Sequence, residues 1–149
     1  MLLRMLPEQV SEQWAIIKEA IQASAGVYTI PEAKMTNILS MLLSGNMQCW
    51  VLVDENNRAD VYAVITTFTY DDPLGEKTLF VFSLYAYKNI PIRLWKSLFD
   101  TLKRWAKSLG CSSVSAYVRN EAEKKILERM GGDIKTVLVR VPLETNGRL

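Results

Sequence analysis

The stretch YKNIPIRLWKSLFDTLKRWAKSLGC, residues 87–111, decides the fold. After Pro91, apolar residues recur every three or four positions, a spacing that lines one face of a helix, and Gly110 is a typical helix end. The residues on this face are Trp95, Leu98, Phe99, Leu102, Trp105, Ala106 and Leu109. Before the helix, TLFVFSLYAY (78–87) is apolar almost throughout, as central strands are. After it, SSVSAYVRN (112–120) predicts another strand, so we expect a right-handed crossover and parallel pairing.

Outside this stretch, the same periodicities predict the remaining elements. The spacing of Val10, Trp14, Ile17 and Ile21 predicts a first helix, and TIPEAKMTNILSMLLSGN (29–46) a second. The turn DENNRAD (54–60) separates two strands, Cys49–Val53 and Val61–Thr69, and so predicts a hairpin.

Toward the end of the chain, Asn120 and Glu123 form a capping-box-like start to the helix EAEKKILERM (121–130), and IKTVLVRVP (134–142) predicts a last strand. The order is ααβββαβαβ, an α/β (α+β) fold with a mixed sheet flanked by helices. We expect one domain over residues 1–149, with a loose tail at 143–149.

Composition excludes several classes of protein. Histidine is absent from the 149 residues, which removes Ser-His-Asp catalysis and histidine metal sites. The charge of +2 does not indicate a nucleic-acid partner. There is no apolar run of the roughly 20 residues that a membrane helix needs, and MLLRMLPEQV (1–10) lacks a long signal-peptide core. Cys49 and Cys111 are not spaced as metal ligands. We therefore expect a cytoplasmic protein with reduced thiols and no metal site.

The element order and lengths resemble the GNAT acetyltransferase superfamily over nearly the whole chain. Members show a strand, a pyrophosphate loop and a helix of the form L-L-x-x-L-x-x-x-A-x-x-x-G, then a strand, an Asn and a helix ending Y-E-K-L-G-F. The residues that match the first helix are Leu98, Phe99, Leu102, Ala106 and Gly110. Those that match the second part are Asn120, Glu128, Arg129, Met130 and Gly131. The resemblance implies the GNAT fold.

Two positions depart from the family pattern. The glycines of the family loop, which let backbone N–H groups approach a pyrophosphate, fall at Pro91, Arg93 and Trp95. Pro91 has no N–H to donate, and the Trp95 indole would stand in the path of the phosphate unless it turns into the core. The tyrosine that often protonates the leaving thiolate in the family falls at Leu127. The pattern therefore predicts a degenerate acetyl-CoA site.

The resemblance also implies site residues for an active enzyme. Acetyl-CoA would contact residues on the third strand, at the junction and before the last helix, namely Leu84, Tyr85, Lys88, Arg93, Lys96 and Asn120. At the junction, side-chain charge would replace backbone amides. Asp71 or Asp72 would act as general base and Tyr85 or Tyr117 as substitute acid. The alternatives are that the aspartates are turn residues, that the tyrosines pack on the sheet, and that Asn120 only caps its helix.

Two functions of different classes remain open. In the first, the fold is a non-catalytic binding or assembly module without a cofactor, with Trp95, Arg104 and Lys107 at the interface. Its partner would be a protein, a larger assembly or a second copy of the chain. The chain also looks similar to small acetyltransferase-like proteins of tailed bacteriophages, which implies a virion or accessory role in the host cytoplasm. In the second, it is an acetyl-CoA-dependent N-acetyltransferase with an atypical cofactor grip.

Overall fold

The computed structural model describes residues 1–26, 29–118, 120–134, 139 and 141–143. The chain divides into two compact units, Met1–Tyr117 and Val118–Leu149. That the whole chain is a single domain stays a prediction, and we describe each unit by itself.

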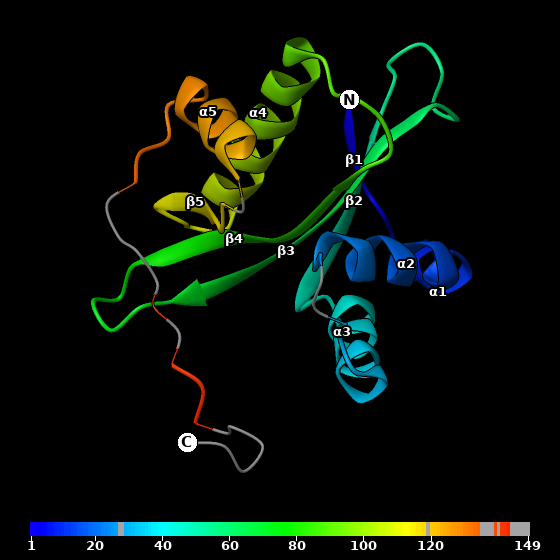
Figure 1. Ribbon diagram of the computed structural model, residues 1–149, viewed down its shortest axis with the longest axis horizontal. Helices are drawn as coiled ribbons and strands as arrows, with labels where there is room; N and C mark the ends of the chain where they lie inside the picture. Colours follow the sequence, from blue (N-terminus) through cyan, green and yellow to red (C-terminus); the bar gives the residue numbers. More distant parts are fainter. Residues whose placement is uncertain (27–28, 119, 135–138, 140, 144–149) are drawn as a thin grey trace. The chain divides into compact units, whose positions relative to one another are not determined.

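The first unit is built on one sheet (Figure 1). Its strands lie in the order β1-β2-β3-β4-β5, with antiparallel neighbours except for the parallel pair β4–β5. The strands are β1 Leu2–Arg4, β2 Met47–Val53, β3 Val61–Asp71, β4 Lys77–Ala86 and β5 Ser113–Ala116. The mixed sheet, the position of β4 between two neighbours and its parallel pairing with β5 confirm the predicted fold class.

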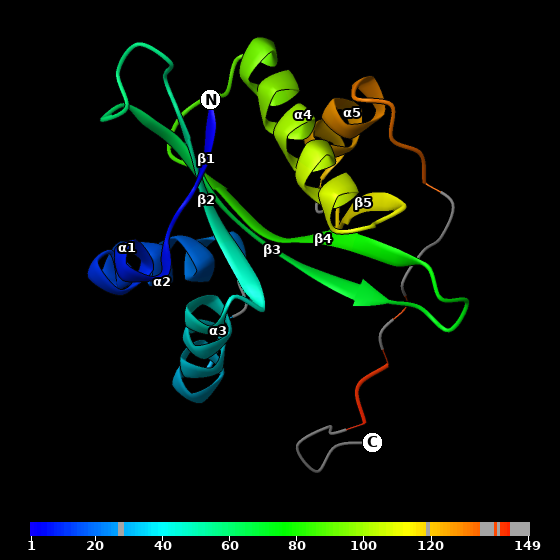
Figure 2. The same ribbon diagram turned by 180° about the vertical axis from the view of Figure 1, so that it is seen from behind.

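Four helices cover the two faces of this sheet (Figures 1 and 2). They are α1 Pro7–Glu12, α2 Trp14–Ser24, α3 Glu32–Ser44 and α4 Ile92–Ser108. Leu94, Leu98 and Leu102 of α4 pack with Trp50 and Leu52 of β2, in a core that also includes residues of β1, β3 and β4. On the opposite face, α1, α2 and α3 pack a second core against Met47, Cys49 and Val64. Alternate residues of β2 therefore serve opposite cores, as the period of a strand requires.

The N-terminal elements differ from the prediction in two places. Leu2–Arg4 forms a strand that pairs with Leu52–Trp50, whereas the prediction began with a helix. Three residues are too few to show an alternating pattern, so the strand left no signal. The first predicted helix is two helices, because Gln13 adopts φ −103° and ψ 15° and separates α1 from α2.

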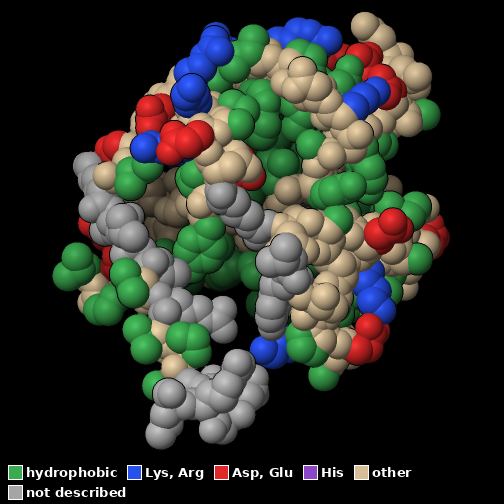
Figure 3. All heavy atoms as spheres, in the orientation of Figure 1, with side chains coloured by type: hydrophobic (Ala, Val, Ile, Leu, Met, Phe, Trp, Pro, Cys, Tyr) green, Lys and Arg blue, Asp and Glu red, His purple; other side chains and the backbone are tan. Residues whose placement is uncertain are grey.

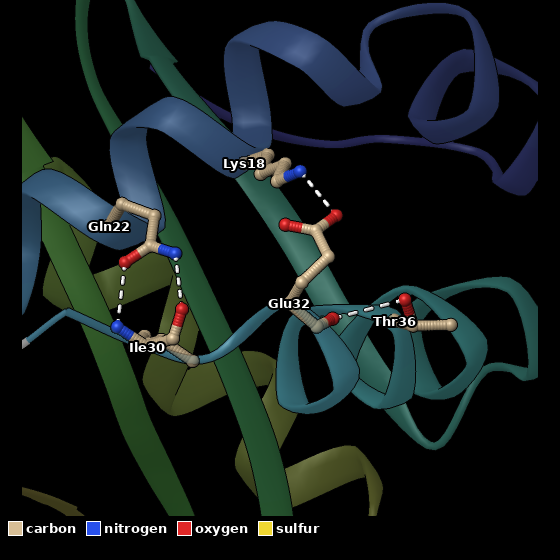
Figure 4. Close-up of polar contacts among 5 residues, drawn as sticks. All are labelled: Lys18, Gln22, Ile30, Glu32 and Thr36. Atoms are coloured by element: carbon tan, nitrogen blue, oxygen red, sulfur yellow. Dashed lines mark hydrogen bonds and ion pairs between the residues drawn. The ribbon is translucent and has the colours of Figure 1, made fainter.

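Hydrogen bonds hold the start of α3 beside α2 (Figure 4). The side chain of Gln22 donates to the carbonyl of Ile30 at 2.7 Å and accepts from its N–H at 2.9 Å. Lys18 of α2 forms an ion pair with Glu32, the first residue of α3, with 2.5 Å between nitrogen and oxygen. These contacts connect α2, which packs on β4, with α3, which packs on β2.

The second unit contains helix α5, Glu121–Arg129. Its cap is as predicted: the Asn120 side chain accepts the N–H of Glu123 at 2.9 Å. The predicted last strand falls on 134–142, of which 135–138 and 140 lie outside the described residues. Residues 144–149 of the predicted loose tail also lie outside them.

Candidate functional site

Strand β4 carries a bulge in its middle. Thr66 of β3 pairs with Ser83, but the next residue, Thr67, pairs with Val81, so Phe82 has no partner on β3. Two consecutive side chains consequently lie on the same face. Phe82 packs against the α1–α3 core, and the Ser83 hydroxyl shares a 2.5 Å hydrogen bond with Thr66, which is on that face. A bulge places backbone groups outside the regular ladder and often lies beside an active site.

Strand β5 leaves β4 at the same level. The parallel pairing runs from Thr78 with Ser113 to Val81 with Ala116. Within the first unit, Phe82–Ala86 therefore has no strand on its β5 side, and we call this segment the open edge of β4. An open strand edge presents N–H and C=O groups that can pair with a ligand containing amides.

A short connection, residues 87–91, joins the open edge to α4. Pro91 is the N-cap with φ −60° and ψ 151°, and its carbonyl accepts from Leu94 at 2.9 Å and from Trp95 at 3.1 Å. Within the first unit, the N–H groups of Ile92 and Arg93 have no intramolecular acceptor. Such N–H groups at the positive end of a helix dipole favour anions.

The Trp95 indole turns toward the core. It packs against the α4 core, as does buried Ile90, and stacks on Phe99 with 6.2 Å between ring centroids. Ile90 and Trp95 occupy the two positions of a hydrophobic staple, which fixes how a chain enters a helix. The indole is half-buried, and its predicted obstruction of the phosphate approach stays a prediction. Its predicted interface role stays a prediction.

The three predicted phosphate-binding cations are not together. Arg93 and Lys96 lie exposed in the first turns of α4. Lys88 instead forms an ion pair with Asp60 in the β2–β3 connection, and its nitrogen lies 4.3 Å from the centroid of the Tyr62 ring. The hydrogen bond with Asp60 raises the pKa of Lys88. Lys88 is therefore paired with the β2–β3 connection. Arg93 and Lys96 remain as the cations that could bind an anion at the start of α4.

The other predicted cofactor residues, Leu84 and Tyr85, lie on opposite faces of β4. Leu84 packs against the α4 core and Tyr85 against the α1–α3 core. Tyr85 meets Tyr87 edge to face with 5.1 Å between ring centroids. Burial, followed by the carboxylate of Glu19 on α2, raises the pKa of Tyr87. Sequence reasoning missed Glu19, since an exposed glutamate on a helix gives no signal until the fold brings it to Tyr87.

Tyr117, the other predicted acid, lies where β5 separates from β4. It directly follows β5, and its ring meets Phe80 edge to face with 4.8 Å between centroids. Its exposed position leaves the hydroxyl accessible to a ligand. Tyr85 therefore lies on the open edge and Tyr117 beside Phe80, and the acid role of either tyrosine stays a prediction.

Asp71 and Asp72, the predicted bases, lie at the turn between β3 and β4, beside the end of β4 that is farther from the open edge. Asp71 pairs with Lys77, and the Asp72 carboxylate accepts the N–H groups of Leu74 and Glu76, both at 2.9 Å. Five residues separate Lys77 from the bulge, about 17 Å along an extended strand. The turn interpretation of the two aspartates accounts for these contacts, and the fold does not bring them to the open edge.

Other candidate residues have local roles in the structure. Asn120 caps α5. Arg104 and Lys107 are exposed on α4, and Arg104 donates to the Thr101 hydroxyl at 3.2 Å. Cys49 is a buried core residue, and burial raises the pKa of its thiol to about 12. Among the described residues, no group of three carboxylates or thiols could hold a metal ion.

The geometry and the comparisons define the class: the chain has the fold of the GNAT acetyltransferases. No family model matches the sequence, and no curated protein matches it either. The similarity appears in solved structures, and one is a probable acetyltransferase at 11% identity and a TM-score of 0.73, with 98% of this chain and 99% of that chain covered.

Two other solved structures are similar over nearly their full length. A ribosomal-protein-alanine N-acetyltransferase from Brucella melitensis biovar Abortus 2308 is 13% identical with a TM-score of 0.67, over 96% of this chain and 99% of that one. A "predicted acetyltransferase" from Clostridium acetobutylicum, solved with acetyl-CoA, is 12% identical with a TM-score of 0.70, over 96% of each chain. At these identities the likeness shows the fold alone. In the described part of the chain, no helix is both long and apolar enough to cross a membrane.

Proposed function

We propose that the protein is an acetyl-CoA-dependent N-acetyltransferase. The observation that carries the proposal is the coincidence of two features on β4: the bulge at Phe82 and the departure of β5 after Val81. Together they leave a stretch of strand edge beside displaced backbone groups, and this stretch leads to the start of α4.

The residues present fit acetyl-CoA in two parts. The open edge of β4 offers backbone donors and acceptors to the amides of the pantetheine arm. At α4, the free N–H groups of Ile92 and Arg93, together with the exposed cations of Arg93 and Lys96, suit a diphosphate. This grip would use side-chain charge in place of the glycine loop, with the Trp95 indole packed against the α4 core.

Acetyl-CoA would supply a thioester whose acetyl group passes to an amine, with release of the thiol. The chain's own groups would perform three tasks. A backbone N–H at the bulge would polarise the acetyl carbonyl, Glu19 would accept the proton of the amine, and Tyr85 or Tyr117 would donate one to the leaving sulfur. Glu19 replaces the aspartates in this scheme and would act through an intervening water, since its charge raises the pKa of Tyr87, which follows the open edge five positions beyond the bulge.

Thermal unfolding with and without acetyl-CoA tests the proposal. Ligand at 100 times its dissociation constant stabilises a fold by about 2.7 kcal/mol, which is a shift of several degrees for a domain of this size. We expect that shift, and acetylation of a primary amine in the same preparation. No shift at millimolar acetyl-CoA would exclude the enzyme.

A non-catalytic binding module is the second candidate, because the α4 entry is poor in donors. The connection before α4 contains no glycine, Pro91 at the N-cap donates nothing, and Leu127 stands where the family has its tyrosine. In that case, we expect no effect of acetyl-CoA and a stable protein complex or homo-oligomer, as a virion component would form. Light scattering after size-exclusion chromatography, without and with acetyl-CoA, separates the two candidates.

A further inference from the structure

Helix α4 gathers positive charge on the face that its core residues leave free. Each of its charged residues lies three or four positions from another, so they share one side of the helix, opposite the buried leucines. They are Arg93, Lys96, Asp100, Lys103, Arg104 and Lys107, and all of them are exposed. We call these six residues the charged stripe.

The charged stripe differs in sign from the rest of the chain. It holds five cations and one carboxylate, a net charge of +4, whereas the whole chain carries +2, so the other residues together carry −2. On the side of the molecule that Figure 3 shows, Lys and Arg side chains lie along the upper margin, where α4 begins in Figure 1. A local surplus of one sign attracts partners of the opposite sign.

No ion pair within the described residues neutralises the charged stripe. Asp100 has Lys96 four positions before it and Arg104 four positions after it, a spacing at which ion pairs form on helices. It pairs with neither, and Arg104 donates to the Thr101 hydroxyl instead. Attraction to the helix dipole accounts for Lys107, in the last turn of α4, but does not reach the charges before it.

The order of signs along the charged stripe selects the class of partner. Two cations precede Asp100 and three follow it. A row of phosphates, as on a nucleic acid or an anionic membrane, has one sign throughout and would be repelled at Asp100. A protein segment can place a cation opposite Asp100 and carboxylates on either side, so that each charge of the stripe faces an opposite one.

The spacing of the charged stripe suits another helix. At 1.5 Å per residue, the successive distances along the α4 axis from Lys96 to Asp100, Lys103 and Lys107 are about 6, 4.5 and 6 Å. A helix that lies alongside α4 repeats these intervals with residues three and four positions apart. Charged residues on neighbouring helices select partners in this way in coiled coils.

We propose that the charged stripe binds an acidic helix of a partner protein, one that carries a Lys or Arg between its carboxylates. The inference does not depend on the proposed function, because it concerns the exposed side of α4 and fits an enzyme as well as a binding module. Arg93 and Lys96 belong to both proposals, so the test variants leave these two residues unchanged.

Two fluorescent peptides of about 20 residues, rich in alanine so that they form helices, test the class of partner. Both carry Glu three, four and seven positions on either side of a central residue, which is Lys in one peptide and Glu in the other. This arrangement matches the charged stripe in either helix direction. Fluorescence anisotropy with the full chain at low ionic strength measures the two dissociation constants.

We expect the peptide with the central Lys to bind about 5-fold more tightly, although the peptide with the central Glu is more negative, because only the Lys pairs with Asp100. Equal binding of the two peptides, tighter binding of the peptide with the central Glu, or no binding of either would overturn the proposal.

The substitution Asp100→Lys tests the order of signs directly. It makes the charged stripe uniformly basic, so the preference should reverse and the peptide with the central Glu should bind about 5-fold more tightly. A preference that does not reverse would show that Asp100 does not face the partner, and would overturn the proposal. Circular dichroism checks that this variant and those below are folded.

A pair of double variants separates the charged stripe from the net charge of the chain. Lys103→Ala with Lys107→Ala should weaken binding of the peptide with the central Lys by about 10-fold. Lys34→Ala with Arg58→Ala removes two exposed cations outside α4 and is the matched control, because it changes the net charge equally. Equal losses in the two double variants would overturn the proposal.

The other anionic occupants are tested with the same preparation. A single-stranded RNA and vesicles that contain phosphatidylserine should bind the native chain more weakly than the peptide with the central Lys. Tighter binding of either would overturn the choice of a protein partner. A salt-sensitive dimer in light scattering that Lys103→Ala with Lys107→Ala abolishes would also overturn it, because the charged stripe would then bind a second copy of the chain.

Discussion

The two faces of the sheet are completed in different ways. The face under α4 is closed by a continuous core in which Leu94, Leu98, Leu102 and Ala106 meet the strands. The face under α1–α3 also has a buried core around Val64. Beyond Phe68, however, it ends in the solvent-exposed rings of Tyr70 and Tyr117. The comparison shows that the two faces of one sheet differ in how far they are covered. Strand β4 serves both, with Leu84 on one side and Tyr85 on the other.

The largest expected effect is on the free energy of unfolding, at the face of the sheet that α4 covers. Leu98→Ala removes a buried side chain of α4 and should lower the free energy of unfolding by about 3 kcal/mol. Tyr70→Ala, at an exposed residue on the opposite face, should lower it by under about 1 kcal/mol. Urea denaturation of the two variants measures the difference. Equal losses would mean that Tyr70 is part of the structural core.

The next effect is on the rate of acetylation. Glu19→Gln keeps the shape of the side chain but cannot accept a proton, so kcat should fall by about 100-fold with little change in the free energy of unfolding. Glu12→Gln, at an exposed residue of α1, is the control. An unchanged kcat would remove Glu19 from the proposed chemistry and leave the base on another element.

A smaller effect is expected on the affinity for acetyl-CoA, at the start of α4 next to the open edge. Arg93→Ala should weaken acetyl-CoA binding by about 10-fold, the scale of one charge-assisted contact at an exposed site. Lys107→Ala, at the other end of the same helix, should change the dissociation constant little. Calorimetric titration of both variants gives the comparison, and equal losses would point to non-specific attraction by the helix.

The smallest effect is expected at the β3–β4 turn. Asp71→Asn and Asp72→Asn should change kcat for propylamine by less than about twofold, because these residues lie away from the bulge. A kcat measurement at saturating acetyl-CoA is sufficient. A large fall for either variant would reinstate that aspartate as the base and imply that the turn moves toward the open edge.

The sequence predicted those helices and strands whose apolar residues recur with a regular period within a single segment. The helix from Ile92 to Ser108 has apolar residues on one face for almost five turns, so its burial and the parallel pair around it followed from spacing alone. The same holds for the hairpin of β2 and β3 and for the Asn120 cap. Local signals of this kind need no knowledge of the rest of the chain.

The candidate site depends instead on contacts between distant segments. The bulge at Phe82 is a mismatch in register between β3 and β4, and neither strand shows it by itself. The charge of Glu19 acts on the pKa of Tyr87 only because α2 packs on β4. From its sequence position, Trp95 could be assigned to the phosphate approach or to the core, and only the folded structure shows that it packs against the α4 core.

Cys49 offers a way to time the opening of the α1–α3 face. Because burial raises its thiol pKa to about 12, the reactive thiolate is almost absent at neutral pH while the protein is folded. An alkylating reagent should therefore modify Cys49 only when this half of the sheet opens, and Cys111, half-buried against the other core, should react sooner. Mass spectrometry of the labelled chain would measure the alkylation rate of each cysteine, and so the rate at which each side of the sheet opens.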